Sequence, residues 1–179
     1  KVDYEQVKLD MIQPAAYGNV RGLELEPRAT ISLIGRGGPA AYWKAVEQGA
    51  MKAAEDMNAL LGYKGDDKVK VIFSAPENEN DVDAQVNILD EELARYPAAI
   101  GIAMVDSSAC EVQFDLATEN NIPIVAFDSG TNYQNIVSMI KTDDREAAEM
   151  AANKLCDLIG DEGEILIIAH DKMSMTAEE

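Results

Sequence analysis

The sequence predicts an α/β fold, an open parallel sheet with helices on both faces. Short runs of apolar, often β-branched residues recur from Thr30 onward, and they are apolar throughout rather than alternating with polar residues. Such runs are typical of strands that are buried on both faces. Between them, apolar residues recur every three or four positions, as they do in amphipathic helices. This alternation indicates right-handed strand–helix–strand crossovers within one sheet.

Each apolar run is predicted to form one strand. In chain order the runs are Thr30–Ile34, Val69–Phe73, Ala99–Met104, Pro123–Phe127, Ile136–Ile140 and Glu164–Ile168. The first helix carries its apolar face at Trp43, Val46, Ala50, Ala53, Met57 and Leu61. The second carries it at Val82, Val86, Leu89 and Leu93, so we expect its remaining residues Asp90, Glu91 and Glu92 to point to water.

Residues that stabilise helix ends mark the third and fourth helices. Ser108 followed by Glu111 is a capping-box pattern that predicts the start of the third helix. Asp143 followed by Glu146 predicts a similar start for the fourth, whose inward face would include Ala148, Ala151, Leu155 and Ile159. Gly160 is expected to end that helix, because glycine readily adopts the left-handed conformation of a helix end.

The composition excludes several classes of function. The 179 residues include 33 acidic and 15 basic ones, which gives a formal net charge of −18. Because nucleic acids and anionic membranes attract basic surfaces, we expect no nucleic-acid partner and no binding to such membranes. Cys110 and Cys156 lack metal-ligand spacing, and we expect them to be free and buried rather than joined in a disulfide.

No set of residues that could carry catalysis is found. His170 is the single histidine, so we expect it to be exposed or satisfied by the fold rather than catalytic. The glycine-rich segment 35–38 fits neither the dinucleotide nor the phosphate-loop motif, and no nucleophile-elbow motif occurs. The acidic segment 77–81 lacks the glycine and terminal glutamate of an EF-hand loop. We therefore expect no enzymatic activity, no metal and no cofactor.

The candidate site lies where the predicted strands end, because ligands of open parallel sheets bind beyond the carboxyl ends of the strands. Tyr42 and Trp43 follow the first strand, and they could stack on a sugar ring, although Trp43 also continues the apolar stripe and could simply be core. Asp106 follows the third strand and could bind a ligand hydroxyl group, because helix capping explains the neighbouring Ser108 but not Asp106. Asp128 follows the fourth strand, where turn formation is the alternative to hydroxyl binding. We expect Asp106 and Asp128 to converge on one pocket mouth.

These junctions resemble those of the ribose-binding-like periplasmic sugar-binding proteins of ABC transporters, which share a Rossmann-like fold with the effector domain of the lac repressor. The matching segments, which together cover residues 29 to about 177, are Ile31–Ile34 through Tyr42-Trp43 to Gly49-Ala50, Asp81-Val82 with Gln85, Ala99–Ile102 to Asp106-Ser107, Asn121–Val125 into Asp128-Ser129, and Thr142-Asp143. The resemblance implies that Tyr42 and Trp43 form the stacking platform and that Asp128 binds hydroxyl groups. Ser129 stands where some members place an arginine, and Arg36 lies near the pocket mouth without matching a fixed family position.

The resemblance also implies a division of the chain. Residues 1–28 would be an N-terminal extension, residues 29–141 the sugar-binding first lobe, and residues 142–179 the hinge crossing and the incomplete start of a second lobe. The chain is thus expected to be a fragment that binds sugar weakly or not measurably, with its apolar second-lobe segment folding back, self-associating or moving freely. The implied function is extracytoplasmic solute binding for a membrane permease, with a lipid anchor as one form of attachment. The alternative is a ligand-sensing domain of a signalling or transcriptional regulator.

Overall fold

The structure, a computed structural model, describes residues 22–178 with the exception of residue 24. Most of the expected N-terminal extension therefore lies outside the described residues. The described chain forms one parallel sheet in the order β2-β1-β3-β4-β5. The strands are β1 (Thr30–Ile34), β2 (Lys70–Ser74), β3 (Ala99–Ile102), β4 (Ile124–Phe127) and β5 (Ser138–Ile140). The parallel sheet confirms the predicted fold class.

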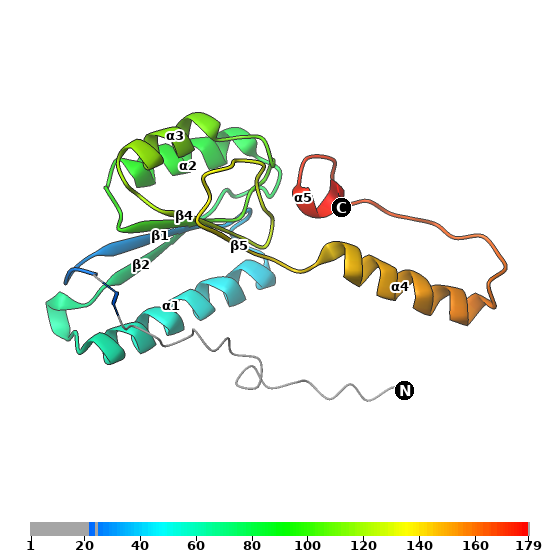
Figure 1. Cartoon of the computed structure of the whole chain (residues 1–179), viewed down its shortest axis with the longest axis horizontal. Helices are drawn as coiled ribbons and strands as arrows, with labels where there is room; N and C mark the ends of the chain where they lie inside the picture. The colour runs from blue at the N-terminus through cyan, green and yellow to red at the C-terminus, as the bar shows by residue number, and fades with distance from the viewer. Residues whose placement is uncertain (1–21, 24, 179) are drawn as a thin grey trace.

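Helices cover both faces of this sheet. Figure 1 shows α1 (Ala41–Leu61) on one face and α2 (Val82–Leu93) with α3 (Glu111–Glu119) on the other. A short 3-10 helix, η2 (Gly65–Asp67), precedes β2. The main core lies between the sheet and the pair α2 and α3, and its fully buried side chains include Ile34, Leu89, Ile100, Ile102, Phe114 and Ile124.

The strand order positions the site. The chain moves from β1 outward to β2 and then returns to β3 on the other side of β1. The connection after β1 and the connection after β3 therefore run in opposite directions, and the loops at the carboxyl ends of these two strands diverge to leave a crevice. Helix α1 begins after the loop that follows β1, so its first turn lies at this edge of the sheet.

The expectation that Glu92 points to water was wrong. Glu92 is buried, and its carboxylate accepts hydrogen bonds from the hydroxyls of Ser32 (2.7 Å) and Ser74 (3.0 Å) and from Arg95 (2.8 Å). These donors replace the water that the carboxylate loses on burial. Both serines lie on strands that are distant in sequence, so helical periodicity could not reveal this environment.

The predicted start of the fourth helix was correct, whereas the predicted start of the third was not. The amide of Glu146 donates to the Asp143 carboxylate (3.0 Å) at the start of α4 (Asp144–Ile159), as predicted, and Gly160 ends this helix with a φ of 69°. The predicted cap at Ser108 was wrong. Helix α3 instead begins after Cys110, which has a φ of 67° and makes no side-chain cap. Cys110 is free and buried, whereas Cys156 is free and exposed, contrary to expectation.

The predicted strand Glu164–Ile168 does not form. Its apolar residues are exposed, from 58% at Ile165 to 85% at Leu166, and α4 has no buried residue. A strand needs neighbours that take up its backbone hydrogen bonds, and among the described residues no strand lies beside this segment. Figure 1 shows α4 extending away from the sheet before the chain returns to the short helix α5 (Met175–Glu178).

Candidate functional site

A pocket of about 260 Å³ lies at the carboxyl ends of the strands, as expected for an open parallel sheet. Its volume is that of roughly eight or nine water molecules, enough for a small polar molecule. Four segments supply its walls: the loop after β1 with the start of α1, the loop before α2, the turn after β4, and the segment before α5. The lining residues are Arg36, Tyr42, Trp43, Glu79, Asn80, Asp128, His170 and Asp171.

The side chains of Tyr42 and Asp128 meet in this pocket. The Tyr42 hydroxyl donates a hydrogen bond of 2.5 Å to Oδ1 of Asp128. Partial burial, this hydrogen bond and the negative charge of Asp128 together raise the pKa of Tyr42 to about 12. The phenol therefore remains a neutral donor at physiological pH. With one carboxylate oxygen engaged by Tyr42, the other lone pairs of Asp128 are available to ligand hydroxyl groups.

The backbone after β4 directs Asp128 to this position. Strand β4 ends at Phe127, and Asp128 adopts a φ of 58° while its amide donates to the Ile140 carbonyl at 3.0 Å. Aspartate is among the few residues other than glycine that adopt the left-handed region with little cost. Sequence analysis left turn formation and ligand binding as alternatives for Asp128, and the structure shows that this residue makes the turn while its carboxylate faces the pocket.

Trp43 belongs to both the core and the pocket. It is only 3% exposed, yet it lines the pocket and packs edge-on against Tyr42, with ring centroids 5.0 Å apart. Gly35 permits this packing, because a Cβ at position 35 would lie 2.8 Å from Phe73 and 3.0 Å from Trp43. Tyr42 is 55% exposed and offers the larger accessible aromatic surface.

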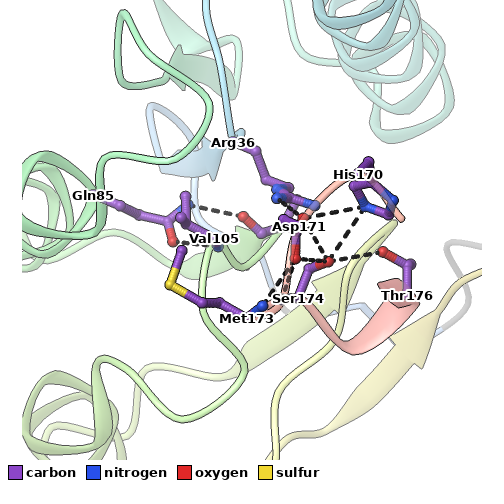
Figure 2. A network of polar contacts seen from close by, with 9 residues as sticks. Arg36, Gln85, Val105, His170, Asp171, Met173, Ser174 and Thr176 are labelled. Carbon is purple, nitrogen blue, oxygen red and sulfur yellow. Dashed lines mark hydrogen bonds and ion pairs between the residues drawn. The ribbon is translucent and has the colours of Figure 1, made fainter. Parts of the chain in front are cut away.

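Arg36 and Asp171 form a buried ion pair in the wall of the pocket. Their side chains are 10% and 6% exposed, and Nη2 of Arg36 lies 2.9 Å from Oδ2 of Asp171. Figure 2 shows Asp171 at the centre of a polar network with Arg36, His170, Met173 and Ser174. The sequence predicted Arg36 near the pocket mouth but gave no partner for it.

Burial of Asp171 raises the pKa of its carboxyl, but the hydrogen bonds from the Ser174 amide, Arg36, the Met173 amide and the Ser174 hydroxyl outweigh this effect. The net result is a pKa well below the usual range of aspartate. The lowered pKa stabilises the folded state at all pH values above the ordinary aspartate pKa. This contribution is lost only as the pH falls through the lowered value, so the network is intact at neutral pH.

Asp106 and Ser129 are not among the residues that line the pocket. Oδ1 of Asp106 accepts a hydrogen bond from the Ser108 amide at 2.8 Å, so its carboxylate serves the adjacent turn. Ser129 is fully buried, and its hydroxyl has no hydrogen-bond partner among the described residues. The expected convergence of Asp106 with Asp128 is therefore not seen, and Asp128 meets Tyr42 instead.

Four pocket residues were missed by sequence analysis. Glu79 and Asn80 lie in a segment that resembled a solvated loop. His170 was expected to be exposed or satisfied by the fold, and its side chain is 61% exposed with Nε2 3.1 Å from Oδ2 of Asp171. Asp171 had a detectable signal, because it follows an apolar run as Asp106 and Asp128 do. It also stands three residues before Ser174, whose amide it binds at 2.8 Å.

Three other features of the described residues bear on function: a second pocket, the grouping of possible metal ligands, and the length and polarity of the helices. A larger hollow of about 700 Å³, lined by Lys141, Thr142, Asp143, Arg145 and Glu178, contains none of the predicted site residues. In the part of the chain that the structure describes, no three or more His, Cys, Asp or Glu side chains are grouped as a metal site would require. None of the described helices combines the length and apolar character needed to cross a membrane.

The chain matches one family model and is similar to several solved structures. Residues 31–179 match the family model of the periplasmic binding protein domain. A carbohydrate transporter solute-binding protein from Agrobacterium radiobacter, solved with D-arabinose, is 31% identical with a TM-score of 0.73. The match covers 84% of this chain and 49% of that one. A search of curated protein sequences gives no match.

Two further solved structures share the fold. A sugar transporter from Clostridium phytofermentans is 23% identical, with a TM-score of 0.73 and coverage of 84% of this chain and 52% of the other. A solute-binding protein from Agrobacterium vitis, solved with D-fucose, is 24% identical, with a TM-score of 0.71 and coverage of 83% and 49%. The chain thus spans about half the length of these structures.

Proposed function

Because this chain belongs to the family of periplasmic binding protein domains, we propose that it is the first lobe, with the start of the second, of a receptor that binds a monosaccharide. The observation that carries the proposal is the pairing of Tyr42 with Asp128 in a pocket at the strand ends. An aromatic face packs on the C–H face of a sugar ring, while a carboxylate accepts hydrogen bonds from its hydroxyl groups.

The solved structures to which the chain is similar support this ligand class. Among them are proteins solved with D-arabinose, D-fucose and D-allose. They are solute-binding proteins rather than enzymes, in agreement with the absence of a nucleophile motif in this sequence. The roles of Arg36, Tyr42, Trp43 and Asp128 toward the sugar belong to this proposal, whereas Asp106 and Ser129 have no place in it because they do not line the pocket.

The receptor acts outside the cytoplasm and delivers its sugar to a membrane permease, as the family assignment and the similarity to ABC transporter components support. Sugar contacts from both lobes favour the closed form, which the permease distinguishes from the open form. Attachment by a lipid anchor is a further part of the proposal. The exposed apolar residues of α4 and of segment 165–168 offer the isolated chain a surface for self-association.

A thermal-shift screen of the two-lobed protein that contains this chain tests the proposal. The screen uses D-arabinose, D-fucose, D-allose and neutral controls such as mannitol. At a hundredfold excess over Kd, a bound sugar adds about 2.7 kcal/mol of stability, which raises the Tm of a protein of about 300 residues by about 4 °C. The 179-residue chain should show a much smaller shift, because it holds one lobe's contacts and only the start of the other's.

Two results would contradict the proposal. If no monosaccharide raises the Tm of the two-lobed protein, the ligand is not a sugar of this class. If the isolated chain shows the same affinity as the two-lobed protein, the second lobe contributes nothing to binding and the two-lobe account fails.

A further inference from the structure

The segment before and within α5 is held against the first lobe by contacts that converge on Asp171. Oδ1 of Asp171 accepts hydrogen bonds from the amides of Met173 (2.9 Å) and Ser174 (2.8 Å). Oδ2 receives Nη2 of Arg36 at 2.9 Å and the Ser174 hydroxyl at 2.8 Å. Figure 2 shows these contacts around one carboxylate. Asp171 therefore shapes its own turn and also joins that turn to the first lobe.

A second contact lies beside the ion pair. The amide of Ser107, which follows β3, donates to the carbonyl of Met173 at 3.0 Å. The carbonyl of Ser107 accepts from the hydroxyl of Thr131 at 2.9 Å, so this residue links the turns after β3 and β4 to the returning segment. Ser174 is fully buried at this junction. These hydrogen bonds hold the segment against the turns after β3 and β4.

The ion pair carries a cost that limits its strength. Arg36 is buried, and its Nε has no hydrogen-bond partner among the described residues. An unsatisfied N–H and a desolvated guanidinium both oppose the closed arrangement, and separation of the two segments would return them to water. These costs offset part of the attraction between Arg36 and Asp171. The pair therefore favours the closed arrangement only moderately.

We propose that Arg36 and Asp171 form a latch between the two lobes, which holds the pocket wall carrying His170 in place before a sugar binds. Arg36 then positions this wall in addition to the role toward the sugar proposed above. The role of the latch in closure depends on the proposed function, a two-lobed receptor that closes on a sugar. It makes closure partly independent of the ligand, so that a smaller share of the sugar's binding free energy is spent on bringing the lobes together.

Amide hydrogen exchange of the 179-residue chain, measured without sugar, tests the latch. The variants are Arg36→Met, Asp171→Asn and the double variant, with Arg28→Met as the control. Asparagine keeps an acceptor for the amides of Met173 and Ser174 but removes the charge. Arg28 pairs with Asp67 on the surface of the first lobe, with Nε 3.4 Å from Oδ1, so its loss removes an arginine without touching the latch.

Each single latch variant should raise exchange in peptides covering 172–178 and at Ser107 by about tenfold or more, because opening of the segment becomes easier. Peptides from β1 and β3 should stay protected, which shows that the first lobe remains folded. The double variant should exchange no faster than the faster single variant, since both changes break one interaction. Arg28→Met should behave as the unchanged chain.

Three results would overturn the latch. The first is unprotected exchange of 172–178 in the unchanged chain, and the second is unaltered exchange in both single variants. The third is a double variant whose effect equals the product of the two single effects. None of these measurements involves a sugar, so failure of the sugar screen would leave a positive exchange result standing, and a failed latch would leave the sugar screen unaffected.

Discussion

Replacement of Asp128 by asparagine is expected to weaken monosaccharide binding by the two-lobed protein by about ten- to a hundredfold. The carboxylate is a charged acceptor that lines the pocket beside Tyr42, and a hydrogen bond to a charged group contributes about 1.5–3 kcal/mol. Asparagine has nearly the same shape, retains an oxygen for the Tyr42 hydroxyl and tolerates the φ of 58° at this position. The loss should therefore appear in the calorimetric Kd and not in the Tm of the sugar-free protein.

Asp106→Asn is the matched control for this substitution. Asp106 also follows a strand, but its carboxylate binds the Ser108 amide and does not line the pocket. Its replacement should leave the Kd unchanged within about twofold. Equal losses in the two variants, or an unchanged Kd in Asp128→Asn, would show that the Asp128 carboxylate does not bind the sugar.

Phe114→Ala should lower the free energy of unfolding of the first lobe by about 3–5 kcal/mol, the range for large-to-small changes at buried aromatic residues. Phe114 is fully buried on α3, where it packs among core residues of the sheet and lies 5.2 Å from the Tyr133 ring. Its removal leaves a cavity that the surrounding strands cannot fill. Urea unfolding followed by the fluorescence of Trp43 measures the change.

Val112→Ala provides the comparison on the same helix. Val112 is 75% exposed, so its truncation should change stability by no more than about 0.5 kcal/mol. A similar loss in both variants would mean that α3 is not packed on the sheet as described.

The sheet was largely predictable because each of its strands coincides with a short apolar run in the sequence. No residue of β1 (Thr30–Ile34) or β4 (Ile124–Phe127) is exposed, and a strand covered on both faces needs a continuous apolar sequence. The segment 164–168 has the same local character but forms no strand, because strand formation also requires a neighbour to hydrogen-bond with. The local sequence pattern therefore shows that a segment can form a strand. Whether the strand forms depends on neighbouring strands that are distant in sequence.

The candidate site was predictable for the same reason and to the same extent. A single rule, that the carboxyl ends of parallel strands share one edge, directed attention to Tyr42 and Asp128, which lie 86 residues apart and whose side chains meet in the structure. The rule did not show that Asp106 would turn toward its own loop. Nor could it reveal the Arg36–Asp171 pair, which joins residues 135 apart through the return of the chain after α4.

Trp43 allows the most direct test of where the sugar binds. It is the single tryptophan of the chain and lines the pocket beside Tyr42 and Asp128. Titration of the 179-residue chain with the sugar that gives the largest thermal shift should produce a saturable change in Trp43 emission, with a midpoint in the millimolar range or above. Asp128→Asn should move that midpoint at least tenfold higher. An emission change identical in the unchanged chain and in Asp128→Asn, or binding seen by calorimetry without any change at Trp43, would contradict the placement of the sugar in this pocket.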